Sequence, residues 1–238
     1  SMQLRHVVTA FLLNPDDGTV LLGKRSGDVH TYPHHWAGIS GSVEEAGPRG
    51  QAYREIKEET CLEREQVELE AEGWPLRFTD WELETVWVVH PYLFRCLAPE
   101  AVRRDWEHLQ FEWVDPDQIP DAATVPHLHD AYQAARRAAE AGGHIRCEDV
   151  FDHVRDDREH GAAELGVWTL LGLKTALQDL SGESRSAGEL VKKFNRRCRT
   201  AAGLRPAMAP PASAAAEAFR AVREIASEST SAAELART

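Results

Sequence analysis

Three glutamates, Glu55, Glu58 and Glu59, are spaced i, i+3 and i+4 in a segment with the pattern of an amphipathic helix. A helix over residues 48–62 would carry all three carboxylates on one face, away from its apolar stripe. Like charges at this spacing repel one another by about 0.2–0.5 kcal/mol per exposed pair. A cluster of hard oxygen ligands is what Mg²⁺ or Mn²⁺ selects. The spacing predicts a metal-binding helix, and a solvated acidic helix face is the alternative.

Strand patterns surround this helix. We expect strands in five segments, 5–13, 19–24, 67–73, 84–96 and 110–114. The first two strands are joined by the turn signal Asn14-Pro15-Asp16-Asp17-Gly18, and a second helix is expected over 127–141. Pro91 cannot donate to a strand ladder, so we expect a bulge or an edge position there. The first half of the chain is therefore predicted to be an α+β domain.

The character of the sequence changes at Gly142-Gly143. Beyond this point the strand patterns vanish, and helices are expected over 148–158, 162–180, 187–202 and 212–226. We therefore predict two domains, residues 1–142 and residues 143–238. The second is expected to be a small all-α helical domain.

The charge balance restricts the partners that the chain can have. A net charge of −12 gives no field that would attract nucleic acid or an anionic membrane. A polyanionic small molecule can still bind if a metal ion bridges it to the acidic protein. None of the four cysteines forms a CxxC pair, which favours a reduced, cytoplasmic compartment. We also see no apolar stretch long enough to span a membrane.

The segments around the acidic helix resemble a known motif. Residues 36–44 read WAGISGSVE and residues 54–62 read REIKEETCL. Together they are similar to the Nudix box, G-x5-E-x7-R-E-U-x-E-E-x-G-U, where U is apolar. The resemblance covers roughly residues 5–141 and implies the Nudix fold, an α/β/α sandwich. It also implies that Mg²⁺ or Mn²⁺ is held by the three glutamates with a backbone carbonyl near Ser40 or Gly41.

The match to the box has two departures. The first box glutamate falls on Ala46 or on Gly47, depending on the end from which the residues are counted, and the loop is one residue short. Glu44 or Glu45 could substitute for it. The box glycine is replaced by Cys61. The resemblance therefore leaves two functions open, a diphosphate hydrolase and a weakly active module that binds or senses a nucleotide or sugar phosphate.

For the hydrolase, the resemblance implies attack of water on the diphosphate of ADP-ribose, a nucleotide sugar or phosphoribosyl pyrophosphate. Metal ions neutralise phosphate charge and activate the water. Glu55 and Glu58 are the expected catalytic carboxylates, and one of the glutamates or a loop acid would take the proton. Arg54 cannot lose its charge, so it could hold a glutamate in a fixed rotamer.

Several further residues are candidates for substrate binding. His30, His34 and His35 precede the box with Trp36 and could contact a phosphate or stack on a base, or they could belong to a solvated loop. Glu107 could supply another carboxylate or a base, and Arg25 is assigned to the same site. The tryptophans could line a nucleobase or sugar pocket, although most tryptophans fill core volume; these are Trp74, Trp81, Trp87 and Trp106.

The second half carries its own resemblance. Residues 157–165 read DREHGAAEL and residues 202–210 read AGLRPAMAP. They look like the N-terminal helices of the translation initiation factor 2B alpha-subunit family, which includes ribose-1,5-bisphosphate isomerases. The resemblance implies phosphate contacts from Arg158, His160 and Arg205, or a translation-related scaffold. The alternative is a small helical bundle used for packing or for forming a homo-oligomer. The family's nucleotide-fold domain is absent from the sequence, so we expect a truncated chain without isomerase activity.

Overall fold

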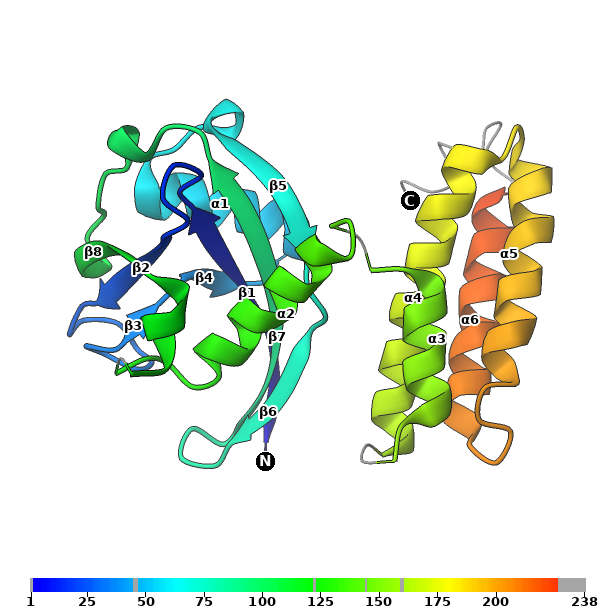
Figure 1. Ribbon diagram of the computed structural model, residues 1–238. Helices are drawn as coiled ribbons and strands as arrows, with labels where there is room; N and C mark the ends of the chain where they lie inside the picture. The colour runs from blue at the N-terminus through cyan, green and yellow to red at the C-terminus, as the bar shows by residue number, and fades with distance from the viewer. Residues whose placement is uncertain (1, 45–46, 122, 144, 159–160, 227–238) are drawn as a thin grey trace. The chain divides into compact units, whose positions relative to one another are not determined.

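The computed structural model describes residues 2–44, 47–121, 123–143, 145–158 and 161–226. The chain divides into two compact units, Ser1–His144 and Ile145–Thr238. The first unit combines strands and helices, whereas the described part of the second unit is helical (Figure 1).

The first unit is built on a mixed sheet, in which eight strands are described. They are β1 (Gln3–Leu13), β2 (Val20–Arg25), β3 (Trp36–Ala37), β4 (Ile39–Ser42), β5 (Val67–Glu72), β6 (Leu76–Asp80), β7 (Thr85–Cys96) and β8 (His108–Val114). Strands β1 and β7 pair in parallel along the whole of β1. Antiparallel partners extend the sheet on both sides: β2 and β4 pair with β1, β8 pairs with β2, and β5 and β6 pair with β7.

Two α-helices cover opposite faces of this sheet, α1 (Gly47–Thr60) and α2 (Leu128–Glu140) (Figure 1). Side chains alternate between the faces along β1, so that Val8 and Leu12 pack in one core with Ile56 of α1, and Phe11 packs in the other with Tyr132 of α2. Three short 3-10 helices complete the unit: η1 (Arg64–Gln66), η2 (Pro99–Ala101) and η3 (Pro116–Asp121). The result is the expected α/β/α sandwich.

The five expected strands and both expected helices of this unit are confirmed, with small shifts at their ends. The short strands β3, β4 and β6 were not predicted. The expectation for Pro91 was wrong, because β7 lies inside the sheet rather than at its edge. Pro91 falls where β7 changes its antiparallel partner. Along β7, the residues paired with β6 end at Val89 and those paired with β5 begin at Tyr92. The register shift lies in β5 instead, between Leu69 and Ala71.

The second unit contains four described helices, α3 (Cys147–Asp156), α4 (Ala162–Glu183), α5 (Ala187–Ala202) and α6 (Ala209–Ala226). Their apolar faces meet in one core that includes Phe151, Leu173 and Phe194. All four expected helices are confirmed. Helix α4 continues past its expected end at Leu180, and α6 starts earlier because prolines are tolerated in a first helical turn.

The three candidate phosphate contacts of this unit differ: Arg158 is exposed, Arg205 bonds within the unit, and His160 is not described. The Arg205 guanidinium donates to the carbonyl oxygens of Arg155 and Asp157, at 3.2 and 2.6 Å. It therefore supports the C-terminal end of α3. His160 lies outside the described residues. Among the helices that are described, none is both long enough and apolar enough to cross a membrane.

Candidate active site

The three glutamates of α1 lie in different environments. Glu59 is buried, with 3% of its surface exposed, and its Oε1 accepts a hydrogen bond from the backbone N–H of Ser40 at 3.2 Å. Glu55 is half-buried and accepts from the Gln51 side chain at 2.7 Å. Glu58 is exposed. Helix α1 therefore directs two carboxylates toward the sheet and leaves the third at the surface.

Strand β4 brings its backbone close to these carboxylates. A β-carbon built on Gly41 would lie 1.8 Å from Oε1 of Glu55 and 2.1 Å from its carboxyl carbon. No larger residue fits at this position unless the glutamate moves, which explains why a glycine stands there. The close packing of β4 against the acidic face of α1 therefore requires the glycine.

Burial makes the charged forms of the two inner carboxylates unfavourable. It raises the pKa of Glu59 well above the ordinary value, and the negative charge of Glu55 raises this pKa further. Burial also raises the pKa of Glu55, although the hydrogen bond from Gln51 opposes the shift. Two buried carboxylates side by side become favourable as anions when a cation joins them.

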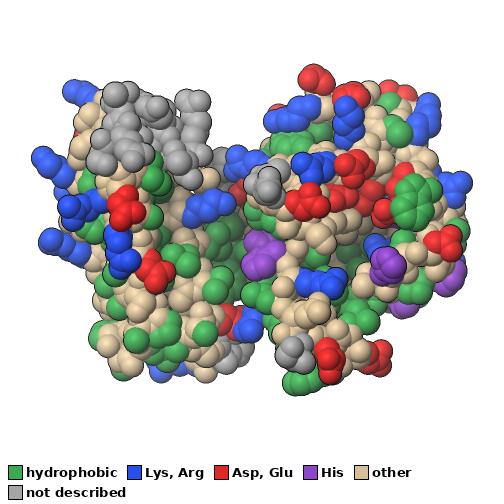
Figure 2. Space-filling model, turned by 180° about the vertical axis from the view of Figure 1, so that it is seen from behind, with side chains coloured by type: hydrophobic (Ala, Val, Ile, Leu, Met, Phe, Trp, Pro, Cys, Tyr) green, Lys and Arg blue, Asp and Glu red, His purple; other side chains and the backbone are tan. Residues whose placement is uncertain are grey.

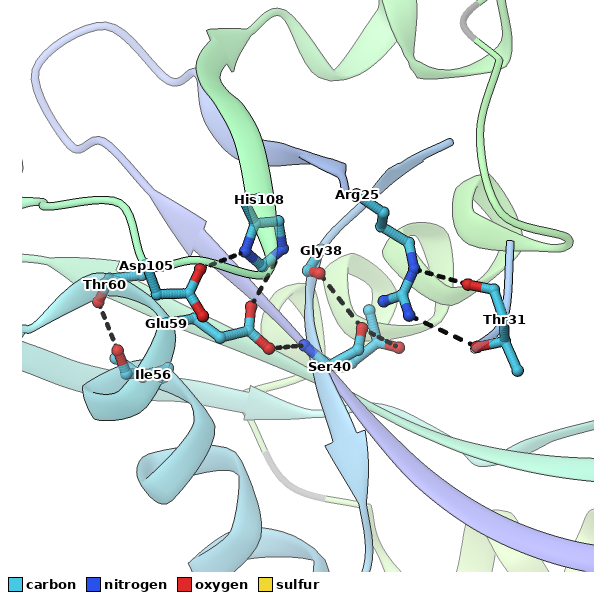
Figure 3. A network of polar contacts seen from close by, with 10 residues as sticks. Arg25, Thr31, Gly38, Ser40, Ile56, Glu59, Thr60, Asp105 and His108 are labelled. Carbon is cyan, nitrogen blue, oxygen red and sulfur yellow. Dashed lines mark hydrogen bonds and ion pairs between the residues drawn. The ribbon is translucent and has the colours of Figure 1, made fainter. Parts of the chain in front are cut away.

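A buried histidine faces Glu59 from β8 (Figure 3). Nε2 of His108 lies 3.4 Å from Oε2 of Glu59, and Nδ1 donates to Oδ1 of Asp105 at 2.8 Å. Sequence reasoning did not identify His108 or Asp105. The only local signal is an acid three residues away from a histidine, a spacing that also occurs on the surface of this protein at His127 and Asp130.

The carboxylates suit a divalent metal ion, although as they stand no three described His, Cys, Asp or Glu side chains form a ready site. Oε2 of Glu59 is buried without a hydrogen bond from the described residues, and the 3.4 Å contact with His108 is too long to satisfy it well. An unsatisfied carboxylate oxygen beside a second acid is a hard, anionic donor set. Hard divalent cations fit such a donor set.

A cavity of about 370 Å³ adjoins the β4 side of this site. Its polar part includes Ser40, Gly41, Arg25 and Glu107. The Arg25 guanidinium is half-buried and donates from Nε to the carbonyl oxygen of Thr31 at 3.0 Å (Figure 3). Burial lowers the pKa of Arg25, while the charges of Glu59 and Glu107 act in the opposite direction. A cation and acids therefore share one end of the cavity.

The other part of the cavity is apolar and aromatic. It is lined by Leu76 and Phe78 of β6, Trp87 and Val89 of β7, and Val125–Leu128 before and at the start of α2. The rings of Phe78 and His127 lie 4.4 Å apart between centroids, with an angle of 38° between their planes. Trp106 also lines the cavity and is largely exposed. Two of the four candidate tryptophans, Trp87 and Trp106, therefore belong to its wall.

The structure separates the residues that we expected to bind substrate. Arg25 and Glu107 line the cavity, whereas His34, His35 and Trp36 are not among its lining residues. Nδ1 of His35 lies 2.9 Å from the carbonyl oxygen of Pro33, within its own loop. The Trp36 side chain packs against the α2-side core. His30, the third candidate histidine of this loop, does line the cavity, together with Tyr32.

Arg54 does hold a glutamate, but in the loop before α1 rather than on the helix. Its Nη1 lies 2.8 Å from Oε2 of Glu44, and both side chains are substantially exposed. The α1 side of the sheet faces the reader in Figure 2, where acidic side chains gather beside lysine and arginine side chains. Glu45 and Ala46, which complete the shortened loop, lie outside the described residues.

Comparison with known proteins connects this site to a family. The family model of the NUDIX domain matches residues 3–137. Similar solved structures include the MutT protein from Methanosarcina mazei Go1, with 22% identity, 58% of this chain and 96% of that chain covered, and a TM-score of 0.45. The dihydroneopterin triphosphate pyrophosphohydrolase of E. coli is 20% identical, with 58% of this chain and 100% of that chain covered and a TM-score of 0.48.

A third similar structure is a binary complex of an Ap4A hydrolase from C. elegans, with 21% identity, 59% of this chain and 99% of that chain covered, and a TM-score of 0.46. No curated protein matches the chain. The NUDIX match ends at residue 137. The resemblance of the helical unit to the initiation factor 2B alpha subunit is not supported by these comparisons and stays a prediction.

Proposed function

The chain belongs to the Nudix family, since the NUDIX model matches more than half of it, and on this premise we propose that it hydrolyses the diphosphate of a nucleotide-linked compound with Mg²⁺ or Mn²⁺. One observation carries the proposal. Gly41, which lines the cavity, is packed directly against the Glu55 carboxylate of α1. The acidic face of the helix therefore lies at the wall of a cavity large enough for a small molecule.

The residues of this site have separate roles in the proposed reaction. Glu55, Glu58 and Glu59 would hold the divalent ion, which supplies neutralisation of phosphate charge and activation of water when bound. Arg25 binds phosphate oxygens through its planar guanidinium at the polar end of the cavity. Glu107 lines the same end, and its ionised carboxylate would serve as the general base that accepts the proton of the attacking water.

The aromatic part of the cavity favours a substrate that carries a base. Phe78, Trp87 and His127 offer flat or apolar surface on which a nucleobase can stack, and each base stacked on an aromatic side chain contributes about 1–3 kcal/mol. Phosphoribosyl pyrophosphate has no ring of this kind. ADP-ribose and nucleotide sugars are therefore the preferred candidates among the three substrates that the resemblance implied.

The direct test is hydrolysis of a panel of ADP-ribose, a nucleotide sugar and phosphoribosyl pyrophosphate in the presence of Mg²⁺. We expect turnover of a base-containing compound by the wild type and none above background after Glu58→Gln combined with Glu59→Gln. Glu65→Gln, an equally conservative change at an exposed glutamate beyond the helix, is the control and should keep full activity. Undiminished turnover in the double variant would exclude the proposed role of α1.

A module that binds nucleotides without cleaving them is the second candidate. It is favoured by Gly47, which stands where one alignment of the box places a carboxylate, and by the pairing of Glu44 with Arg54. Titration calorimetry with the same compounds separates the two functions. Binding of a nucleotide without release of any product over hours would select the binding module.

For residues 143–238 we propose a separate domain that mediates self-association. The support is apolar surface on α4, where Val167 and Leu170 are 58% and 43% exposed. Light scattering should show an oligomer that dissociates after Val167→Glu with Leu170→Glu, and a monomeric wild type would contradict the proposal. The translation-related scaffold is tested by capture of purified initiation factor 2 subunits.

A further inference from the structure

The His108 ring lies between two carboxylates at the first residue of β8 (Figure 3). Because an ionised carboxylate can only accept, the 2.8 Å contact with Asp105 places a proton on Nδ1. This contact also turns Nε2 toward Glu59, whose Oε2 lies 3.4 Å away. The two nitrogens of one ring therefore connect a loop acid to a metal-binding acid of α1.

The surrounding residues fix the ring in this place. Its side chain is 2% exposed, and it packs on Phe111 with a distance of 4.9 Å between ring centroids. A β-carbon built on Gly23 of β2 would lie 2.4 Å from Cδ2 of His108, so the glycine leaves the space that the ring fills. Any other rotamer would have to displace buried neighbours.

Glu59 is contacted from two directions as a result. The backbone N–H of Ser40 binds Oε1 at 3.2 Å, and the His108 ring limits the movement of Oε2 on the other side. Partners behind a metal ligand orient it, and their loss typically weakens metal affinity or activity by about 10–100-fold. The position of His108 matches such a partner, because it contacts the ligand and is not among the residues that line the cavity.

We infer that His108 is a positioning residue, which orients the Glu59 carboxylate toward a divalent cation, and that Asp105 fixes the orientation of its ring. The inference rests on the proposed metal-dependent function and extends its machinery from α1 to β8 and the loop before it. It requires a polar group that reaches the place of Nε2 and limits the movement of Oε2, rather than an imidazole as such.

This requirement gives a matched pair of variants. The amide nitrogen of glutamine reaches about as far from the backbone as Nε2, whereas that of asparagine ends near Nδ1. Mn²⁺ affinity of the full chain is measured by calorimetry without substrate, together with thermal unfolding. We expect His108→Asn to weaken Mn²⁺ binding about 10–100-fold and His108→Gln to retain most of the affinity. Asp105→Asn should also weaken Mn²⁺ binding. The control is His153→Asn, which replaces a histidine of α3 that lies beside an acid, Asp157, and it should leave Mn²⁺ binding unchanged.

Three results would overturn the inference. The wild type could fail to bind Mn²⁺, His108→Asn could bind it as tightly as the wild type, or both His108 variants could lose affinity and thermal stability equally. The last result would give the ring a structural role only. Mn²⁺ affinity that depends on His108 supports the inference even if the protein cleaves no diphosphate. Such a result would contradict the proposed hydrolase activity but not the role of His108.

Discussion

Gly41 and Glu55 are in direct contact, since a β-carbon on the glycine would lie 1.8 Å from the carboxylate oxygen. The contact joins the backbone of β4 to the acidic face of α1. It also brings the cavity wall, to which Gly41 belongs, to the carboxylates that we assign to the metal ion. The position of these two residues relative to one another therefore determines whether cavity and metal ligands can act together.

Gly41→Ala should impair hydrolysis more than folding. The added methyl group meets a side chain that can rotate away, so the glutamate leaves its place while the sheet persists. Displacing a reacting group by about 1 Å can cost on the order of 100-fold in rate. Steady-state kinetics should show such a loss in kcat/KM, with a Tm close to that of the wild type. Gly182→Ala, where nothing lies within 4 Å, is the control, and full activity of Gly41→Ala would show that the contact is not needed.

Glu59→Gln should stabilise the protein when no divalent metal is present. Burial raises the pKa of Glu59 above its ordinary value of 4.5, so the folded state is penalised increasingly as pH rises from 4.5 through the raised pKa. Glutamine removes this penalty. Thermal unfolding in EDTA should therefore give equal Tm values near pH 4.5 and a higher Tm for the variant at pH 8. The Tm difference should be about 2–4 °C for each kcal/mol by which the free energy of unfolding increases.

Added Mg²⁺ should reverse this order, because binding to the folded state stabilises only the chain that binds. The Tm of the wild type should rise, and that of Glu59→Gln should not. Glu65→Gln, at an exposed glutamate outside the proposed site, is the control and should respond to Mg²⁺ as the wild type does. A variant at position 59 that is less stable than the wild type at pH 8 in EDTA would show that the buried charge is already compensated within the protein.

Cys61→Gly should make the protein more stable. Cys61 ends α1 with a φ of 61°, and its N–H donates to the carbonyl oxygen of Lys57 at 2.9 Å. The left-handed conformation costs a non-glycine residue about 1–2 kcal/mol, part of which the greater freedom of glycine in the unfolded chain offsets. Urea unfolding should show a gain of about 1 kcal/mol. Cys61→Ala keeps the β-carbon and should gain nothing, so equal stability of the two variants would contradict the explanation.

Phe78→Ala should weaken the binding of a base without altering the chemistry. Loss of one stacking surface is expected to raise the KM for ADP-ribose about tenfold or more and to leave kcat nearly unchanged. If the protein also hydrolyses phosphoribosyl pyrophosphate, the KM for that compound should be the same in Phe78→Ala and in the wild type. Trp81→Ala is the control, since Trp81 follows β6 and is 79% exposed. An equal rise in KM for both compounds would show that the base does not bind at the aromatic end of the cavity.

The parts of the fold that were predicted from the sequence depend on local periodicity. The spacing of Glu55, Glu58 and Glu59 gave the acidic helix, and the strand patterns gave the central sheet. Strand β6 was missed because only two of its five residues, Leu76 and Phe78, are apolar. Strands β3 and β4 are shorter still, and their glycine-rich sequence carries no strand pattern.

The site was harder to predict, because its contacts join segments that lie far apart in the chain. His108 reaches Glu59 only because β8 pairs with β2 while α1 packs on β4. His34 and His35 were assigned to substrate from their place before the box, yet this loop follows no period that would give side-chain directions. Tyr32 and His34 both adopt a positive φ there, at 48° and 63°. Their places depend on the fold around them.

Hydrolysis in ¹⁸O-labelled water, followed by phosphorus NMR with Mg²⁺ and again with EDTA, is the most direct test of a metal-dependent attack on phosphorus. We predict turnover of a base-containing diphosphate only when Mg²⁺ is present, with one ¹⁸O atom in one of the two phosphoryl products. Turnover that persists in EDTA, or products without the label on phosphorus, would contradict the role of the α1 carboxylates.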